Sequence, residues 1–165
     1  METDTSFAPM AEEFLRRTGD IVWCTATTVD SKGRPRSRIL HPIWQVVDPL
    51  PVGWVVTGRT PVKTAHLAAN PHLACMYWDP DQHTVSIDCL ASWVSDLDTR
   101  RHVFDLFMTT PPPLGYDLGA FGPEEHKSEI FTPLRLDAWG VQMLRPEQLA
   151  AMDLVPRTWR RADSA

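Results

Sequence analysis

The sequence predicts a small antiparallel β-barrel of five to six strands with few helices. Short apolar runs rich in β-branched residues recur along the chain, and clusters of Gly, Pro, Asp and Asn separate them. The first two runs are joined by a tight turn, as in a hairpin, and only a few segments show helical spacing. The length of 165 residues fits one domain with a sizeable core, so we expect residues 1–165 to form a single domain.

The first part of the chain predicts a helix followed by a β-hairpin. Apolar residues at helical spacing cover residues 10–17, and Gly19 ends that helix. Residues 21–29 are rich in Val, Thr and Ile, which is typical of a buried strand. Turn residues at 30–33 connect it to a strand over residues 33–44 that carries arginines at alternate positions.

A short apolar strand over residues 54–57 and a second helix come next. Thr60 supplies an N-cap hydroxyl, and Pro61 occupies the first helical position. The helix ends at Asn70-Pro71, because the residue before a proline disfavours helical geometry.

The second half of the chain predicts three more strands and two helices. The strands cover residues 73–78, 84–94 and 131–143. A helix with an acidic first turn covers residues 96–108, and Pro146 opens a short C-terminal helix.

Residues 109–127, between the helix over 96–108 and the strand over 131–143, form a long loop with three consecutive prolines and three glycines. A loop of this length inside a compact domain is usually functional or mobile. The alternative is a packed crossing of the surface with no role in binding.

Composition and charge exclude several function classes. The net charge of −5 argues against a general partner of nucleic acid or of an anionic membrane. The three cysteines lie in apolar runs without metal spacing, and the six histidines show no zinc pattern, so we expect buried thiols and no metal site. With no signal peptide and no apolar run of about 20 residues, we expect a cytoplasmic protein.

Arginines on the second strand indicate a site for a small anion. Arg34, Arg36 and Arg38 share one face, because side chains alternate along a strand, and they repel one another unless something negative lies against them. The alternative interpretation is an exposed edge strand protected by charge.

The start of the second helix strengthens the anion interpretation. Thr57, Thr60 and the free backbone N–H groups of the first turn can bind an anion, and Lys63 adds a point charge. Arg59 lies in the connecting turn. Because one hairpin separates this segment from the arginine strand, we expect a single phosphate site. The chain has no Walker A or GxGxxG pattern.

The order of these motifs resembles the pyridoxamine 5′-phosphate oxidase-like superfamily, from Gly19 to Trp139. An Arg-x-Arg strand precedes a strand ending in Thr-Gly, a helix with a lysine near its start, and an Asn70-Pro71 step into the next strand. Pro133, followed six residues later by Trp139, is similar to the family's last strand. The resemblance implies a mainly β fold with flanking helices, a six-stranded antiparallel split β-barrel of the FMN-binding type.

The resemblance also implies a cofactor site. Arg38 and Lys63 correspond to the phosphate-binding residues, and the ring of the cofactor lies along Ile39, Leu40 and His41. The implied cofactor-binding residues are Arg36, Arg38, Ile39, Leu40, His41, Val56, Thr57, Arg59, Thr60, Val62, Lys63, Thr84 and Trp139. The site is expected at the interface of a homodimer.

The sequence departs from true pyridoxamine phosphate oxidases. Pro61 and Val62 replace a Ser-Arg pair, Ile43 replaces the lysine that binds substrate, and the arginine-rich C-terminal signature is absent. Pyridoxamine phosphate is therefore not the expected substrate, and the chain is more similar to the actinobacterial-type branch, whose members use FMN or the deazaflavin coenzyme F-420.

The expected function is an FMN-dependent oxidoreductase that transfers a hydride to or from a small organic molecule, because the cofactor supplies chemistry for which the chain has no nucleophile. One alternative is a reductase of the same fold that depends on coenzyme F-420. Another is a non-catalytic protein that binds or stores a flavin, a deazaflavin or a tetrapyrrole. No catalytic residue is assigned; His41 is the candidate for supplying a proton.

Overall fold

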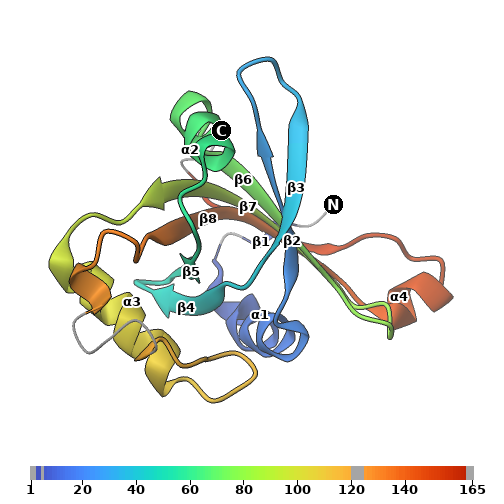
Figure 1. The fold of residues 1–165 in the computed structure, drawn as a ribbon. Coiled ribbons are helices and arrows are strands. Elements are labelled where there is room, and N and C mark those ends of the chain that lie inside the picture. The colour runs from blue at the N-terminus through green and yellow to red at the C-terminus, as the bar shows by residue number, and fades with distance from the viewer. Residues whose placement is uncertain (1–2, 5, 120–124, 163–165) are drawn as a thin grey trace.

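The computed structural model describes residues 3–4, 6–119 and 125–162, and its elements are drawn in Figure 1. The α-helices are α1 (Ala8–Ile21), α2 (Pro61–Ala69), α3 (Leu97–Thr109) and α4 (Pro146–Ala150), with a 3-10 helix at Glu125–Lys127. The strands are β1 (Thr3–Asp4), β2 (Cys24–Val29), β3 (Pro35–Leu40), β4 (Ile43–Val47), β5 (Leu50–Val56), β6 (His72–Trp78), β7 (Thr84–Trp93), β8 (Pro133–Leu144) and β9 (Arg157–Arg160).

The strands of the described residues form one nine-stranded sheet. Its order is β1-β9-β8-β7-β6-β2-β3, and the β4–β5 hairpin joins it where β5 pairs with the first half of β8. All pairs are antiparallel except the short β1–β9 pair. The predicted fold class, a mainly antiparallel split barrel with flanking helices, is confirmed, with more strands than the six expected.

The additional strands have physical causes. The predicted strand 33–44 is divided into β3 and β4, because Pro42 has no N–H to continue a ladder. Asp48, at a φ of 48°, turns β4 back into β5, so β5 begins earlier than the expected strand 54–57. The short β9 pairs with the second half of β8, where β5 no longer pairs, and β1 adds to β9.

The link between β3 and β4 positions the candidate site. β3 pairs only with β2 and β4 pairs only with β5 among the described residues, so these strands end the sheet on opposite sides. Only His41 and Pro42 separate them in the chain. The sheet therefore curls until its two sides approach each other without pairing, which leaves an open seam between the ends of β3 and β5 (Figure 1).

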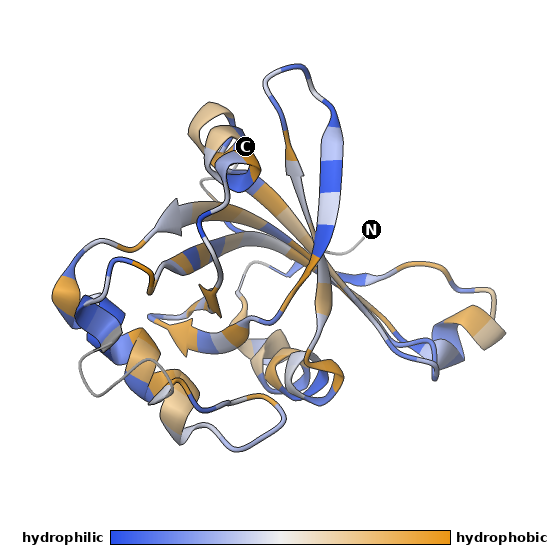
Figure 2. Cartoon of the chain, viewed as in Figure 1, coloured by the Kyte–Doolittle hydropathy of each residue, from blue (hydrophilic) through white to orange (hydrophobic). Residues whose placement is uncertain are grey.

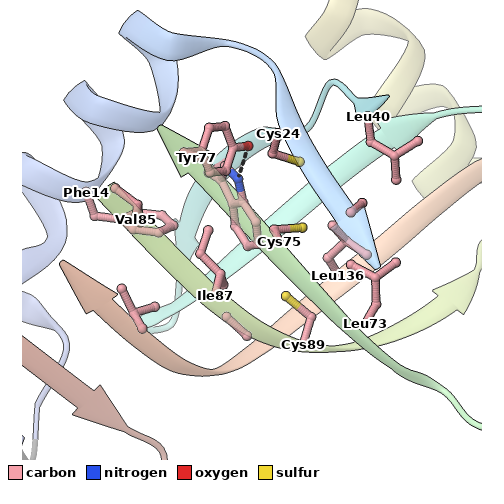
Figure 3. Packing of buried hydrophobic residues seen from close by; sticks show 14 of the residues in the cluster. Phe14, Cys24, Leu40, Leu73, Cys75, Tyr77, Val85, Ile87, Cys89 and Leu136 are labelled. Atoms are coloured by element: carbon pink, nitrogen blue, oxygen red, sulfur yellow. Dashed lines mark hydrogen bonds between the residues drawn. The ribbon is translucent and has the colours of Figure 1, made fainter. Parts of the chain in front are cut away.

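The core lies inside this curled sheet and is closed by α1. Residues of β6 alternate between buried and exposed, as expected for a strand with one face against a core. Fully buried Tyr77 accepts a hydrogen bond of 2.9 Å from the Trp44 indole nitrogen. The buried free thiols Cys24 and Cys75 lie near Tyr77, and the third, Cys89, lies farther along the core (Figure 3).

A second apolar cluster packs α3 against the β4–β5 hairpin. Its largest buried members include Trp54 and Phe107, and Phe131 joins them from the segment that precedes β8. β3, by contrast, is coloured mostly hydrophilic in Figure 2, in keeping with its arginines. Of the loop predicted at 109–127, residues 120–124 lie outside the described part of the chain. None of the described helices has the length and apolar character needed to span a bilayer.

Candidate functional site

Arg38 points to the inner side of the sheet and is held there by the neighbouring strand. Its register opposite Ala26 places it on the face that also carries Leu40. The Arg38 Nη2 group donates a hydrogen bond of 2.8 Å to the Thr28 hydroxyl, which lies 3.0 Å from Nδ1 of His66 on α2. Thr28 is fully buried. A chain of contacts therefore fixes the guanidinium between β2 and α2.

Lys63 reaches the same region from the first turn of α2. The Thr60 side chain caps this helix by accepting a hydrogen bond of 3.4 Å from the Lys63 backbone N–H. The Lys63 ammonium donates to the Thr57 hydroxyl at 2.5 Å and to the Gly58 carbonyl at 2.8 Å. Only 6% of the Lys63 side chain is exposed. The ammonium is thus fixed at the end of β5.

These two cations have no carboxylate partner among the described residues. Burial, and then the charge of Arg38, lowers the pKa of Lys63. Burial, and then Arg36, lowers the pKa of Arg38. The Arg38 Nη1 atom is buried with no hydrogen-bond partner in the described chain. We call Arg38, Thr57, Thr60 and Lys63 the anion cradle, because a phosphate there would satisfy the free donor and neutralise both charges.

An apolar cavity of about 360 Å³ adjoins the cradle at the seam of the barrel. We call it the ring pocket; its lining residues are Trp23, Ile39, Leu40, His41, Val56, Thr57, Pro113 and Tyr116. Thr57 belongs to both the pocket and the cradle. A pocket with aromatic and aliphatic walls next to a phosphate site suits a flat ring that carries a phosphate.

His41 is the buried titratable group of the ring pocket. Its ring lies 4.7 Å from Trp23, 5.3 Å from Tyr116 and 6.1 Å from Phe107, measured between centroids. Burial lowers the pKa of His41, and a hydrogen bond to the Leu114 backbone partly opposes this shift. Its Nε2 atom has no partner in the described part of the chain. Burial therefore favours the neutral form of His41, and its ring keeps one hydrogen-bonding position without a partner among the described residues.

The structure brings together the central residues of the predicted site but not its outer members. Arg34 forms an ion pair with Asp30 at 2.7 Å in the hairpin turn, while Arg36 and Val62 are exposed. Arg59 stacks over Trp93 and lines another cavity.

Thr84 and Trp139 also lie elsewhere in the sheet. Thr84 begins β7 opposite Leu144, and Trp139 in β8 contacts His72 at 5.9 Å. Neither residue lines the ring pocket of its own chain, so their roles remain predictions that depend on a second subunit.

The sequence did not predict five residues of the site. Trp23, Pro113 and Tyr116 line the ring pocket, and Thr28 and His66 hold Arg38. The length of the proline-rich loop signalled a role for Pro113 and Tyr116. Thr28 carried no signal, since a β-branched residue in a strand is common for reasons of packing alone.

The open, mainly antiparallel barrel with flanking helices is a split-barrel architecture, and its seam carries the cradle and the ring pocket. Residues 10–111 match the family model described as pyridoxamine 5′-phosphate oxidase, and the chain belongs to this family. No curated protein matches the chain.

Solved structures share the fold at low sequence identity. A Clostridium acetobutylicum protein related to general stress protein 26 has 14% identity and a TM-score of 0.64, covering 95% of this chain and 96% of its own. A Nostoc punctiforme protein described as pyridoxamine 5′-phosphate oxidase-related and FMN-binding has 17% identity and a TM-score of 0.62, with coverage of 86% and 84%. A Listeria innocua protein described as a putative pyridoxamine 5′-phosphate oxidase has 16% identity and a TM-score of 0.61, with coverage of 82% and 98%.

Proposed function

We propose that the chain is an FMN-dependent oxidoreductase that transfers a hydride to or from a small organic substrate. The observation that carries this proposal is the pair Arg38 and Lys63, two inward-facing cations with no carboxylate partner in the described part of the chain, beside an apolar pocket. A phosphorylated flavin has the matching chemistry, one dianionic group and one flat ring. When bound, FMN supplies the hydride chemistry, and the chain supplies binding, orientation and protection from water.

Each part of the site has a separate task in this proposal. Arg38, Lys63 and the Thr60 hydroxyl hold the phosphate through charge-assisted hydrogen bonds. Leu40 and Val56 contact the ring, and Tyr116 covers it against water. The ring of His41 donates to the Leu114 backbone, so Nε2 of the neutral form can accept a proton and, once protonated, deliver it; we therefore propose His41 as the group that relays a proton to a reduced substrate.

We further propose that a homodimer completes the site. Exposed apolar side chains lie on the outward face of the sheet: Trp23, Ile39, Met76, Trp78 and Leu90. Ile39 on β3 and Met76 on β6 both pair with Thr25 on β2, so they lie in one row across three strands with Thr25 between them. We propose that a second copy of the chain covers this face and that its Thr84 and Trp139 reach the ring pocket. We also propose that residues 1–165 act as one domain, and the free thiols support a reducing cytoplasm.

The double variant Arg38→Ala with Lys63→Ala tests the assignment. Each lost charge-assisted hydrogen bond costs about 1.5–3 kcal/mol, so FMN binding should weaken by about 10²–10⁴-fold. Arg34→Ala is the matched control, because Arg34 is 72% exposed and paired with Asp30. Calorimetric titration with FMN gives the affinity, and circular dichroism verifies the fold. Undiminished FMN binding in a folded double variant would refute the site.

Two alternatives have observations in their favour. Exposed Arg36 and Arg59 near the cradle would suit the acidic tail of the deazaflavin coenzyme F-420. Pro113 and Tyr116 narrow the ring pocket, which would suit a non-catalytic protein that stores a flavin, a deazaflavin or a tetrapyrrole. Titration with FMN and with F-420, followed by a turnover assay with a reductant, separates the three: saturable binding without turnover favours storage.

A further inference from the structure

Another cavity, with a polar lining, is linked to Thr57 through the hydrogen bond that Thr132 in its lining donates to the Thr57 carbonyl. It has a volume of about 360 Å³, and we call it the outer pocket. Its lining residues are Arg59, Trp93, Val94, Ser95, Arg100, Glu129 and Thr132. They come from the turn before α2, the end of β7, the first turn of α3 and the segment that precedes β8.

The outer pocket contains two guanidinium groups without a carboxylate partner in the described chain. Arg59 stacks over the Trp93 ring at 4.9 Å, which orients its guanidinium and leaves its N–H edge free. Arg100 donates to the carbonyls of His126, at 2.7 Å, and Ser128. These carbonyls fix the position of Arg100 but do not neutralise its charge.

The Trp93 indole nitrogen adds an unsatisfied donor. Trp93 Nε1 is buried and has no hydrogen-bond acceptor among the described residues. A buried N–H without an acceptor is unfavourable, so such a group usually has a partner such as a bound ligand or an ordered water. Arg59 thus places a positive charge in the wall of the outer pocket, stacked on Trp93, whose buried N–H would gain an acceptor if a bound anion reached it.

The outer pocket is connected to the anion cradle through one residue. The Thr132 hydroxyl donates a hydrogen bond of 2.7 Å to the Thr57 carbonyl, while the Thr57 hydroxyl accepts from the Lys63 ammonium. Arg59 directly precedes the N-cap Thr60 of α2. Thr57 therefore contacts one residue of each cationic site.

We infer that the outer pocket binds a second anionic group, a carboxylate or a phosphate, next to the phosphate in the cradle. This inference rests on the proposed function for the cradle itself. The anion can belong to an acidic extension of the cofactor or to a separate anionic substrate. Exposed Glu129 is the single opposing charge in the lining, and it sets the expected sign of one test.

Three variants of the outer pocket test this inference, and one of them is expected to change binding in the opposite direction to the other two. Trp93→Phe keeps the aromatic ring but removes the N–H donor, and Glu129→Gln removes the opposing charge. Arg59→Gln removes the cation, and Arg101→Gln is the control, since Arg101 is an exposed arginine on α3 that pairs with Asp105 at 2.9 Å. The probes are FMN, which has one phosphate, the deazaflavin coenzyme F-420 with its acidic tail, and succinate added to FMN-loaded protein.

We expect Arg59→Gln to weaken binding of F-420 or of succinate by about tenfold or more. Trp93→Phe should weaken binding of F-420 or of succinate several-fold, and Glu129→Gln should strengthen it. Neither of these two variants should change the affinity for FMN. An effect on F-420 alone assigns the pocket to the cofactor, and an effect on succinate assigns it to a separate anion. Wild-type affinities in all three variants, or no binding of either probe to wild type, would overturn the inference. Failure of FMN itself to bind would instead contradict the proposed function.

Discussion

The hydroxyl of Thr28 connects the fold to the anion cradle, and Thr28→Val removes it with almost no change of shape. In the wild type this oxygen accepts from Arg38 Nη2 at 2.8 Å and lies 3.0 Å from His66 Nδ1. Since Thr28 is fully buried, no water replaces the lost partner without rearrangement. Arg38 Nη2 would then have no acceptor. Arg38 Nη1, which is buried, already has none among the described residues.

The cost of Thr28→Val follows from these two contacts. A hydrogen bond to a charged group contributes about 1.5–3 kcal/mol and a neutral one about 0.5–1.5 kcal/mol. Because both share one oxygen atom, we expect a net loss of about 2–3 kcal/mol in the free energy of unfolding. For a chain of this length, that loss corresponds to a decrease in Tm of about 4–12 °C. FMN affinity should fall by about tenfold, since Arg38 is no longer held in position.

Thr27→Val is the matched control on the same strand. Its hydroxyl contacts Ser37 at 2.8 Å on the exposed side of the hairpin, so its loss should change the free energy of unfolding by less than about 0.5 kcal/mol. Thermal unfolding without ligand and calorimetric titration with FMN give the two quantities. If Thr28→Val matches Thr27→Val in both measurements, the contact chain does not position Arg38, and the reasoning is wrong.

Two further predictions concern stability. Tyr77→Phe leaves the Trp44 indole N–H buried without its acceptor, so urea unfolding should show a loss of about 1–3 kcal/mol at an unchanged m-value; a smaller loss would mean that the indole finds another acceptor. Burial lowers the pKa of His41 in the folded chain below 6.5, so the unfolded chain binds a proton first as the pH falls. The contribution of neutral His41 to the free energy of unfolding is therefore complete above pH 6.5 and is lost as the pH falls from 6.5 through the folded pKa. Thermal unfolding between pH 4 and pH 8 should therefore show less acid destabilisation for His41→Gln than for wild type, and parallel curves would contradict burial of a neutral His41.

Local signals predicted the parts of the site that are adjacent in the sequence. The hairpin of β2 and β3 followed from its turn residues, and alternation correctly placed Arg38 on one face of β3. Thr60 and Pro61 marked the start of α2, and the cap is present. These features depend on interactions within a few residues, which is why the sequence alone reveals them.

Features that depend on tertiary contact could not be predicted in the same way. Arg59 stacks on Trp93, which is 34 positions away in the sequence. The residues next to Arg59 in the sequence therefore do not distinguish it from a residue of the anion cradle. Trp23 and Tyr116 meet at His41 only because the sheet curls. The division at Pro42 was visible in the sequence, but its result, two strands on opposite sides of one sheet, depends on the pairing of β4 with β5.

The three buried thiols provide an intrinsic probe of strand separation. Cys24, Cys75 and Cys89 are the only cysteines of the chain, and they lie inside the core on β2, β6 and β7. A thiol-reactive reagent reaches them only when these strands part, so the labelling rate reports on opening of the sheet. None of the three lines the ring pocket. Labelling therefore distinguishes a variant that has lost its ligand from one that has lost its fold, without any added reporter group.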